Sequence, residues 1–473
     1  VHRAGHKPGA IIPFFFSDAI ETKIFTLNAR FNQSYSKNTG MHRILLPALA
    51  SLVILALLLA GCMGPGKPGP SGTEETPTPQ PSPGQQSASL DTIVEANNAF
   101  AFDLYQELTG DPEYQDSNIF FSPFSISTAL SITYEGARGQ TAEQIRSVFH
   151  FPDNQSVLRH GYTDLIARIN SGSNAYTLRT ANALWAEQTY PFLTDYINTA
   201  ERTYNAKTTN LDFVHHPEES RVTINQWVED QTEDRIKDLI PPGEINPSTA
   251  LVITNAIYFK GTWVKQFDTA LTRDAEFLTG SGAIVQVPMM QRTDDAAVFR
   301  YAETGSFQVL EMPYESGDGT ELSMLILLPK DGSLDTVEKS LDAGSLQEIR
   351  KSLAYKIVRV YFPKLTMETK YFLPRTLSAM GMPMAFTAGA DFSGMDGSRD
   401  LFITNVIHQA FVEVNEEGTE AAAATAVIMG KGAAPVEEKI PVFRADHPFI
   451  FLIQDNETGN ILFMGRVNNP VGT

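Results

Sequence analysis

The chain has 473 residues, of which 42% are hydrophobic and 19% are charged. This balance excludes global disorder and leaves room for a large buried core. The 36 Lys and Arg against 55 Asp and Glu give a net charge of −19, which argues against a nucleic-acid or anionic-lipid surface, since both need a basic footprint. A single cysteine excludes intramolecular disulfides and any cysteine-rich metal site.

The first part of the chain is predicted to be a targeting segment rather than part of the fold. A basic start at residues 42–43 precedes an uncharged run over 44–60, and those 17 residues make about 26 Å of helix. Because the hydrocarbon core of a membrane is ~30 Å thick, the run suits a signal peptide better than a permanent span. We interpret residues 41–61 as a signal peptide starting at Met41, and residues 1–40 as an over-extended start or a leader.

The only cysteine follows this run directly. The small residues before it in Leu59-Ala60-Gly61-Cys62 resemble the lipobox of prokaryotic lipoproteins, in which the cysteine sulfur is lipidated and the chain is cut just before it. The alternative is an ordinary signal peptide with an incidental Cys62. The lipobox predicts an exported, extracytoplasmic protein, either lipid-anchored or secreted, that meets the membrane only through its anchor.

Residues 62–88 are predicted to be a tether in front of one large domain. The stretch 63–88 holds seven prolines and five glycines in 26 residues, a composition that cannot make a packed element. From 89 to 473 there is no second linker and no repeat, so these residues are predicted to form a single domain.

The expected elements of this domain begin with helices and end with strands. Apolar residues over 93–108 follow helical spacing, Ser122 opens a second helix, and Thr141 and Gln144 form a capping box that opens a third. Because the later strands do not alternate regularly with helices, the fold class is α+β rather than a doubly wound parallel sheet. The later segments predicted to be strands are 250–258, 322–328, 356–362 and 449–453.

A search for catalytic and metal-binding patterns finds no assembled active site. The sequence has no Gly-x-Ser-x-Gly elbow, no His-Glu-x-x-His pair and no phosphate-binding glycine loop. His215 and His216 precede Pro217, which blocks a helix, so we expect a polar loop there with at most a weak metal site. His408 and His447 lie in apolar surroundings typical of hydrogen-bonded core histidines. We therefore expect no enzyme activity, no cofactor and no metal.

A segment near the C-terminus has the pattern of a strand that could enter a sheet. Alternate residues over 419–428 divide it into two faces, and the only charge, Glu420, lies on one of them. The other face is uncharged and small, and is formed by Thr419, Ala421, Ala423, Thr425 and Val427. Because alanine prefers helix, composition alone would favour a surface helix or a linker.

The wider sequence resembles the serpins, from about residue 97 to residue 470. Residues 118–130, NIFFSPFSISTAL, resemble the early serpin helix with its two shutter serines, Ser122 and Ser125. Residues 254–263, TNAIYFKGTW, match the strand that carries the shutter asparagine, Asn255, and the breach tryptophan, Trp263. His408 falls where serpins hold a shutter histidine. Residues 443–453 and 463–467 match the C-terminal motif of the family.

The resemblance implies the serpin fold, in which helices pack around three β-sheets and a reactive-centre loop is exposed. It also implies a buried hydrogen-bonded network beneath the central sheet that must let the sheet open, with Trp263 packed at the insertion point. The residues of this network are Ser122, Ser125, Asn255 and His408. The inhibitory hinge of the family matches Glu417, Gly418, Thr419, Glu420, Ala421, Ala422, Ala423 and Ala424.

The function implied by the resemblance is inhibition of serine proteases as a suicide substrate, with the cleaved loop inserting into the central sheet and trapping an acyl-enzyme. Family spacing places the reactive bond near Lys431-Gly432 or Gly432-Ala433. We prefer Lys431-Gly432, which suits a trypsin-like protease, whereas cleavage beside Met429 or Gly432 would suit a subtilisin-like or elastase-like one. Cysteine proteases are a further target class, and the inhibitor is expected to be a monomer.

Three alternatives are less well supported. A non-inhibitory serpin, acting as a chaperone or carrier, usually has bulky or charged hinge residues, whereas 419–424 is mostly small. A solute-binding lipoprotein would show a two-lobed α/β pattern, which the strand-rich second half lacks. A lipid-anchored hydrolase would need one of the missing nucleophile motifs.

Overall fold

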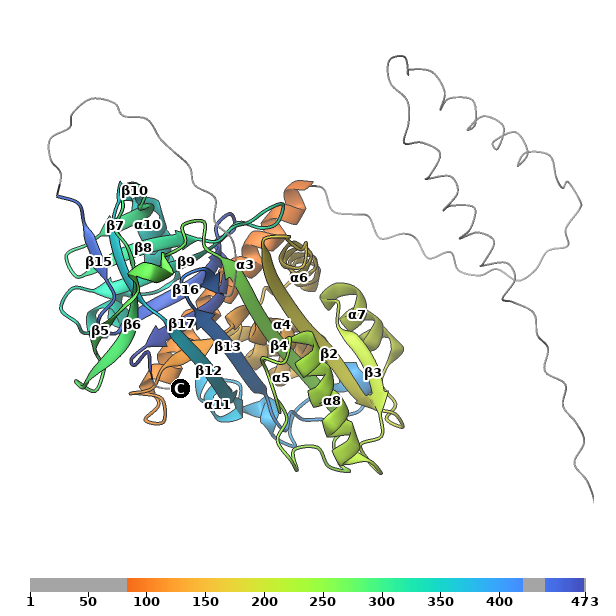
Figure 1. Cartoon of the computed structure of the whole chain (residues 1–473). Coiled ribbons are helices and arrows are strands. Elements are labelled where there is room, and N and C mark those ends of the chain that lie inside the picture. The colour runs from red at the N-terminus through yellow and green to blue at the C-terminus, as the bar shows by residue number, and fades with distance from the viewer. Residues whose placement is uncertain (1–82, 420–438, 472–473) are drawn as a thin grey trace, which may run out of the picture. The chain divides into compact units, whose positions relative to one another are not determined.

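The computed structural model describes residues 83–419 and 439–471, while residues 1–82, 420–438 and 472–473 lie outside the described part. Helices fill most of the first half of this part and strands most of the second (Figure 1). The strands form three sheets of seven, six and four strands. The prediction of an α+β fold with helices around three sheets is therefore confirmed.

The first helices are set by their apolar residues. In α3, Ile93, Phe100 and Leu104 share one face and are fully buried. Every residue of α4 is buried, and Ser122 caps this helix by accepting a hydrogen bond from the backbone N–H of Ser125. The helical elements are α3 (Pro83–Gly110), α4 (Pro123–Gly136), α5 (Gly139–Val148), α6 (Gln155–Ile169), α7 (Thr194–Tyr204), α8 (Pro217–Gln231), η1 (Thr269–Leu271), α9 (Asp335–Ser340), α10 (Ala343–Ser352), α11 (Pro374–Met380), η2 (Pro383–Phe386) and α12 (Ser393–Asp396).

The six-stranded sheet carries the candidate site. Its strands run in the order β12-β13-β4-β2-β3, and β14 pairs with β4. On one face, Ile224 and Val228 of α8 pack in a cluster with Trp185 and Ala256, while α4 contacts β4. Figure 1 shows the sheet between these helices, with α8 in front and α4 behind. The strands are β2 (Tyr176–Glu187), β3 (Lys207–Leu211), β4 (Leu251–Thr262), β12 (Leu365–Phe372), β13 (Ile407–Val414) and β14 (Gly418–Thr419).

The other two sheets follow the orders β1-β17-β16-β9-β8-β7-β10 and β15-β11-β6-β5. Strands β9, β16 and β17 are buried along their whole length, which explains their nearly continuous apolar sequences. The strands are β1 (Ile119–Phe121), β5 (Arg273–Leu278), β6 (Ile284–Arg292), β7 (Val298–Glu303), β8 (Phe307–Pro313), β9 (Leu322–Pro329), β10 (Ala354–Ile357), β11 (Arg359–Pro363), β15 (Val442–Arg444), β16 (Phe449–Asp455) and β17 (Ile461–Val467).

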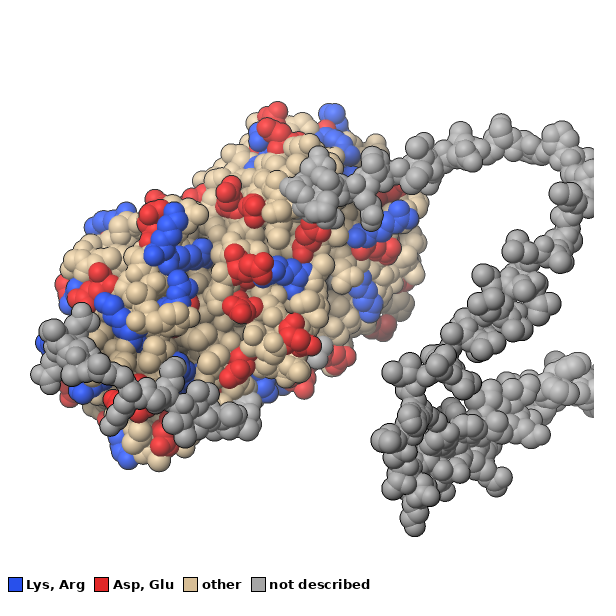
Figure 2. Space-filling view, turned by 90° about the horizontal axis from the view of Figure 1, so that it is seen from above, with Lys and Arg blue, Asp and Glu red and all other residues tan. Residues whose placement is uncertain are grey.

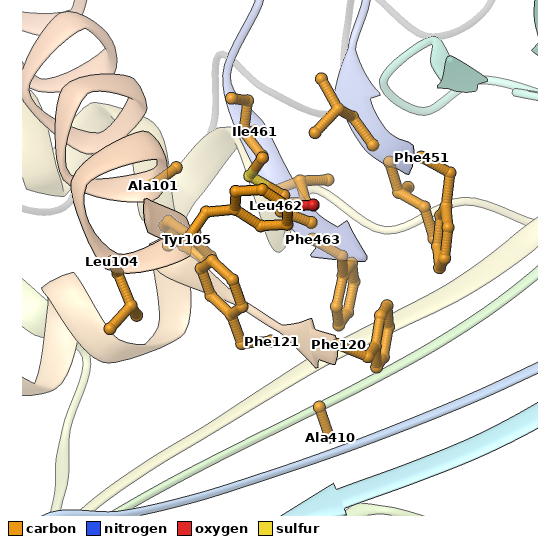
Figure 3. Packing of buried hydrophobic residues seen from close by; sticks show 14 of the residues in the cluster. Ala101, Leu104, Tyr105, Phe120, Phe121, Ala410, Phe451, Ile461, Leu462 and Phe463 are labelled. Atoms are coloured by element: carbon orange, nitrogen blue, oxygen red, sulfur yellow. The ribbon is translucent and has the colours of Figure 1, made fainter. Parts of the chain in front are cut away.

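Aromatic packing joins these layers. The ring of Phe120 stacks on Phe463 and Phe451, with centroid distances of 5.3 Å and 5.8 Å (Figure 3). The backbone N–H of Phe120 donates to the hydroxyl of Tyr371 on β12, at 3.2 Å. The edge strand β1 therefore connects the seven-stranded sheet to the central sheet.

Two predictions about helix starts are wrong in detail. α5 begins at Gly139, so Thr141 and Gln144 do not form its cap. Their side-chain oxygens accept hydrogen bonds from the backbone N–H groups of Asp391 and Met384 instead. The polar loop expected around His215 and His216 ends at Pro217, which is the first residue of α8, a position where proline's missing N–H costs nothing.

Two predicted segment limits also differ. The strand expected over 356–362 is two strands in different sheets, separated at Val358, whose backbone N–H bonds to the carbonyl oxygen of Ala297. The helix α3 begins at Pro83, so it extends back into the predicted tether. The predicted strands at 250–258, 322–328 and 449–453 correspond to β4, β9 and β16.

Candidate functional site

The two edges of β4 are paired very differently. On one edge, β2 pairs with it over eleven positions, from Tyr176 with Gly261 to Ala186 with Leu251. On the other edge, β13 runs parallel to it and has one paired position, Ala410 with Ile257. Within the described residues, this second edge has only β14 as a further partner. The central sheet is thus incompletely closed between β4 and β13.

The strand β14 occupies one end of this open edge. It pairs antiparallel to β4, Gly418 with Thr262 and Thr419 with Gly261. A tight turn after β13 brings it there, in which Asn415 and Gly418 exchange backbone hydrogen bonds of 2.9 Å and 3.3 Å. The backbone N–H of Trp263 donates to the carbonyl oxygen of Glu417 at 2.8 Å and secures the turn. Two predicted hinge residues, Glu417 and Gly418, therefore lie at the end of β4.

The predicted breach tryptophan lies beside this turn. Trp263 is buried and its ring stacks on Tyr314, with the centroids 4.4 Å apart. Its indole Nε1 donates to the carbonyl oxygen of Asn415 at 3.1 Å. The buried indole N–H thus has an acceptor, and this acceptor belongs to the turn that starts β14.

A buried carboxylate supports the same turn. One oxygen of Glu416 lies 2.8 Å from Nζ of Lys364, and the other accepts a hydrogen bond of 2.7 Å from the hydroxyl of Thr272. Burial alone would raise the pKa of Glu416, but the bonds from Lys364 and Thr272 outweigh burial and lower the pKa below its ordinary value. Glu416 is therefore held as a carboxylate.

Ser122 and His408 meet beneath the sheet. The backbone N–H of Ser122 donates to Nε2 of His408 at 3.0 Å, and its hydroxyl donates to the carbonyl oxygen of Leu462 at 2.6 Å. The backbone N–H of Ser125 donates to the Ser122 hydroxyl oxygen at 3.1 Å. These bonds link the start of α4 to β13 and β17.

His408 is held neutral in this network. Burial lowers the pKa of His408 to about 3. Because Nε2 accepts a hydrogen bond, the proton of the neutral ring is on Nδ1, and Nδ1 has no partner among the described residues. A buried N–H without an acceptor costs free energy, so the described part of this network is not fully satisfied.

A cavity lies under the open part of the sheet. Its volume is about 440 Å³, and its lining includes Leu130 of α4, Leu251 and Ile253 of β4, Met395 and His408. The lining is more apolar than polar, but it also includes Glu244, Asp400 and Asn405. This cavity lies where a strand between β4 and β13 would contact the core.

Several predicted site residues cannot be placed. Lys431, Gly432, the hinge residues from Glu420 to Ala424, and Cys62 lie outside the described part of the chain. For Asn255 and Thr419, only the backbone is described: Asn255 pairs with Asn182 of β2, and Thr419 lies in β14. The roles predicted for these residues remain predictions.

The sequence analysis missed the residues that hold the turn: Asn415, Glu416, Lys364 and Tyr314. Glu416 appears in the sequence only as one of several acids before the Ala-rich segment, and its partner Lys364 is distant along the chain. Among the described residues, no group of three or more His, Cys, Asp or Glu is suited to hold a metal ion. In the same residues no helix is both long and apolar enough to span a membrane.

Comparisons with known proteins agree with this geometry. The family model described as Serpin (serine protease inhibitor) matches residues 95–470. An uncharacterized serpin-like protein of Thermococcus kodakarensis is 41% identical over 89% of this chain and 98% of its own length. Leukocyte elastase inhibitor A of Mus musculus is 42% identical over 80% of this chain and all of its own length. Human thyroxine-binding globulin, solved with thyroxine, superposes with a TM-score of 0.71 at 31% identity, covering 81% of this chain and 100% of that one.

The chain belongs to the serpin family. The predictions of the family and of the serpin fold are confirmed. The description of this family is serine protease inhibitor.

Proposed function

We propose that this protein inhibits serine-type endopeptidases as a suicide substrate. Its family and its similarity to an elastase inhibitor support protease inhibition. The observation that carries the proposed mechanism is the open edge of β4, where β14 has started an antiparallel pairing that the residues after it can extend.

The register of β14 predicts how an inserted loop would lie. Since Gly418 pairs with Thr262 and Thr419 with Gly261, each later residue would meet the β4 residue one position earlier. Ala421 would lie opposite Phe259, and Phe259 is buried in the main core. Opposed residues of an antiparallel pair share one face, so the small face predicted from the sequence would turn toward the core.

Further along the same register, Val427 would lie opposite Ile253 and Met429 opposite Leu251. Ile253 and Leu251 line the cavity of about 440 Å³. Filling it with apolar side chains would stabilise the inserted state, since burying a side chain of this size contributes ~1.5–3 kcal/mol. Insertion would therefore combine new backbone pairing with the filling of a cavity, and the uninserted state stores this free energy.

In the proposed reaction, the protease's serine oxygen attacks the carbonyl carbon before the reactive bond and forms an ester as that peptide bond breaks. The leaving nitrogen takes up the serine proton and becomes the new amino terminus of the C-terminal fragment, whose strands β16 and β17 remain in the seven-stranded sheet. Insertion of the N-terminal part then carries the bound protease along the sheet and disturbs its geometry before water hydrolyses the ester. This chain contributes the substrate bond and the sheet edge.

The proposed reactive bond is Lys431-Gly432. A lysine before the bond pairs with the carboxylate in the primary pocket of trypsin-like proteases. Cleavage beside Met429 or Gly432 by a subtilisin-like or elastase-like protease is the alternative. We also propose that Cys62 anchors the protein, as an exported lipoprotein on a tether.

Incubation with a protease panel tests the proposal. Trypsin should give an SDS-stable adduct at the summed mass, and the released C-terminal fragment should begin at Gly432. A fragment starting at Gly430 or Ala433 would contradict the choice of bond only. Cleavage of the loop without any adduct, across trypsin-like, subtilisin-like and elastase-like enzymes, would contradict inhibition.

A carrier function is the second candidate, favoured by the similarity to thyroxine-binding globulin and by the apolar cavity. It predicts that a small apolar ligand raises the unfolding temperature of the protein while no protease forms an adduct. The mostly small hinge residues favour inhibition.

A further inference from the structure

Four cations lie on or near β15, the first strand after the segment that contains the proposed reactive bond. Lys356 of β10, Arg359 of β11 and Lys439 are exposed, and Arg444 of β15 is half-buried. These four residues are called the basic surface. Because β15 follows residues 420–438 in the chain, Lys439 and Arg444 lie on the C-terminal side of the predicted reactive bond, while Lys356 and Arg359 belong to strands that come earlier in the chain.

The contacts hold these residues in one area. Arg359 pairs with Val442, and its backbone N–H donates to the carbonyl oxygen of Pro441, two residues after Lys439. Arg444 lies 3.7 Å from the centroid of the Tyr361 ring, opposite Tyr361 in the same strand pair.

A short chain of contacts connects Lys356 to the same strand. Its Nζ lies 5.9 Å from the centroid of the Tyr301 ring. The Nε2 group of Gln308 donates both to the Tyr301 hydroxyl, at 2.8 Å, and to the carbonyl oxygen of Val442, at 3.0 Å. Lys356 therefore lies on the same region of the surface as β15.

Among the described residues, no carboxylate lies within ion-pair distance of these four cations, although the charge of Lys356 helps to lower the pKa of Glu303. Glu303 is already paired with Lys330 at 2.5 Å, and Glu311 with Arg300 at 2.9 Å. On the face seen in Figure 2, Lys and Arg side chains lie over the end that carries β7, β10 and α10, with some Asp and Glu side chains beside them, while the whole chain has a net charge of −19. A local concentration of positive charge on an acidic protein attracts an acidic partner.

Apolar side chains are interleaved with the cations. Tyr355 is 77% exposed, Val442 44% and Ile357 39%. Arginine and exposed aromatic residues together are typical of protein–protein interfaces, whereas a polyanion site needs mainly a row of cations. The mixture favours a protein partner.

We propose that the basic surface docks an acidic patch on the target protease and so selects among proteases that could cut the same bond. This rests on the proposed function, because a protease held at the loop would bring its own surface close to β15. Charges at the rim of such a contact act mainly on the association rate and on its salt dependence.

The test uses anionic and cationic trypsin, which share a primary specificity and differ in surface charge, each with its catalytic serine replaced by alanine. Binding to wild type and to the double variant Lys356→Glu, Arg359→Glu is measured at ~20 mM and ~1 M salt. At low salt, the charge reversal should weaken binding of anionic trypsin about tenfold or more and not weaken that of cationic trypsin. At ~1 M salt, where the Debye length is ~3 Å, the effect should vanish.

A matched control changes the net charge by the same amount elsewhere. Arg202 of α7 and Lys237, beyond α8, are exposed, and Figure 1 shows α7 and α8 on the opposite side from β10 and β15. Arg202→Glu, Lys237→Glu should change both affinities by about twofold at most. Equal effects from the two double variants would overturn the proposal. So would heparin binding lost only in Lys356→Glu, Arg359→Glu with trypsin affinities unchanged, which would indicate a polyanion site.

Active trypsins separate this proposal from the proposed function. Lys356→Glu, Arg359→Glu should form the same amount of SDS-stable adduct per cleaved loop as wild type, but more slowly with anionic trypsin. If wild type forms no adduct while the charge-dependent binding is observed, trapping is wrong and the docking surface stands.

Discussion

Gly418 lies so close to the carbonyl oxygen of Gly261 that a Cβ atom at position 418 would be 2.1 Å from it. Gly418 also has a φ of +145°, a conformation that residues with a side chain rarely adopt. Both features arise where the chain turns out of β13 and starts β14 against the end of β4. Only glycine fits at this start of the proposed inserted strand.

Gly418→Ala should therefore destabilise the protein. The strained backbone alone costs roughly 1–3 kcal/mol, and the contact with Gly261 would displace β14 from β4. Denaturant unfolding should show the loss. The control is Gly305→Ala, where an added Cβ meets nothing within 4 Å and φ is not positive, so stability should change by less than ~0.5 kcal/mol. Equal unfolding midpoints for both variants would contradict the placement of β14.

Lys364→Met should weaken the turn that holds β14, because it removes the charged partner of the buried Glu416 carboxylate. Leaving such a group without its charged partner costs about 1–3 kcal/mol. Lys351→Met is the control, since its pair with Glu348 is exposed on both sides and should contribute less than ~1 kcal/mol. Similar losses in the two variants would show that Glu416 is solvated.

The Glu416 prediction has a pH dependence. The pKa of Glu416 is lowered from 4.5 in the folded state, so its contribution to stability is present above pH 4.5 and is lost as pH falls through the folded pKa. The difference in unfolding free energy between wild type and Lys364→Met should therefore be largest near neutral pH and shrink below pH 4.5. A difference that does not vary with pH would exclude the ion pair as its cause.

The free energy of unfolding should decrease as pH rises through the pKa of His447. Its Nδ1 lies 2.8 Å from a carboxylate oxygen of Asp446 and its Nε2 lies 2.6 Å from the carbonyl oxygen of Pro329, so both nitrogens donate only when the ring is charged. Burial lowers the pKa of His447, but these two bonds outweigh it, and the net pKa is raised above 6.5. The charged His447 ring therefore contributes fully to the free energy of unfolding below pH 6.5. This contribution is lost as pH rises through the pKa of His447 in the folded protein.

His447→Gln should remove this alkaline loss, measured as unfolding free energy between pH 6 and pH 9. His408 should have the opposite pH dependence, because burial lowers the pKa of His408 to about 3. The stability that the neutral His408 ring contributes is lost as pH falls below 6.5. If the unfolding free energies of His447→Gln and wild type change with pH in the same way above pH 6.5, the His447 ring does not donate from both nitrogens.

The strands with continuous apolar sequence were predictable, and the central strand β2 was not. β9 and β16 are apolar throughout because they are buried on both faces. β2, with the sequence YTLRTANALWAE, mixes strand-favouring Tyr, Thr and Trp with polar residues and alanines, so it has no continuous apolar pattern. Its strand conformation depends on pairing with β4 and β3, which lie later in the chain.

The candidate site was predictable as motifs but not as contacts. Ser122, Trp263 and His408 belong to motifs of a known family, and the structure brings Ser122 and His408 together at 3.0 Å. The pairing of Gly418 with Thr262 joins segments more than 150 residues apart, so no local pattern fixes that register. No local pattern fixes the pairing of Glu416 with Lys364 either, because these residues lie on different segments of the chain.

Cys62→Ala should abolish membrane attachment if the lipobox prediction is right. The thiol is the atom that would carry the lipid, and processing in front of position 62 depends on it. Membrane fractionation should show the variant in the medium or as an unprocessed precursor, while Cys62→Ala in purified protein should leave trapping unchanged. An unaltered membrane fraction would mean that Cys62 is incidental.

Thr419→Arg should convert the inhibitor into a substrate. The backbone of Thr419 pairs with Gly261, so its side chain would be among the first to pass into the sheet during insertion. An arginine on the core face would bury an unpaired guanidinium at a cost of several kcal/mol, which slows insertion without slowing cleavage of the loop. Hydrolysis of the acyl-enzyme would then outpace trapping.

The measurement is the fraction of cleaved inhibitor that appears as SDS-stable adduct, together with the protease activity that remains. Thr419→Arg should give cut loop, active protease and little adduct. The control is Glu420→Arg, one residue further and on the opposite face in this register, where the arginine would remain near solvent and trapping should be nearly normal. Equal trapping by wild type and Thr419→Arg would mean that the loop does not extend β14 into the sheet, and the proposed mechanism would have to be abandoned.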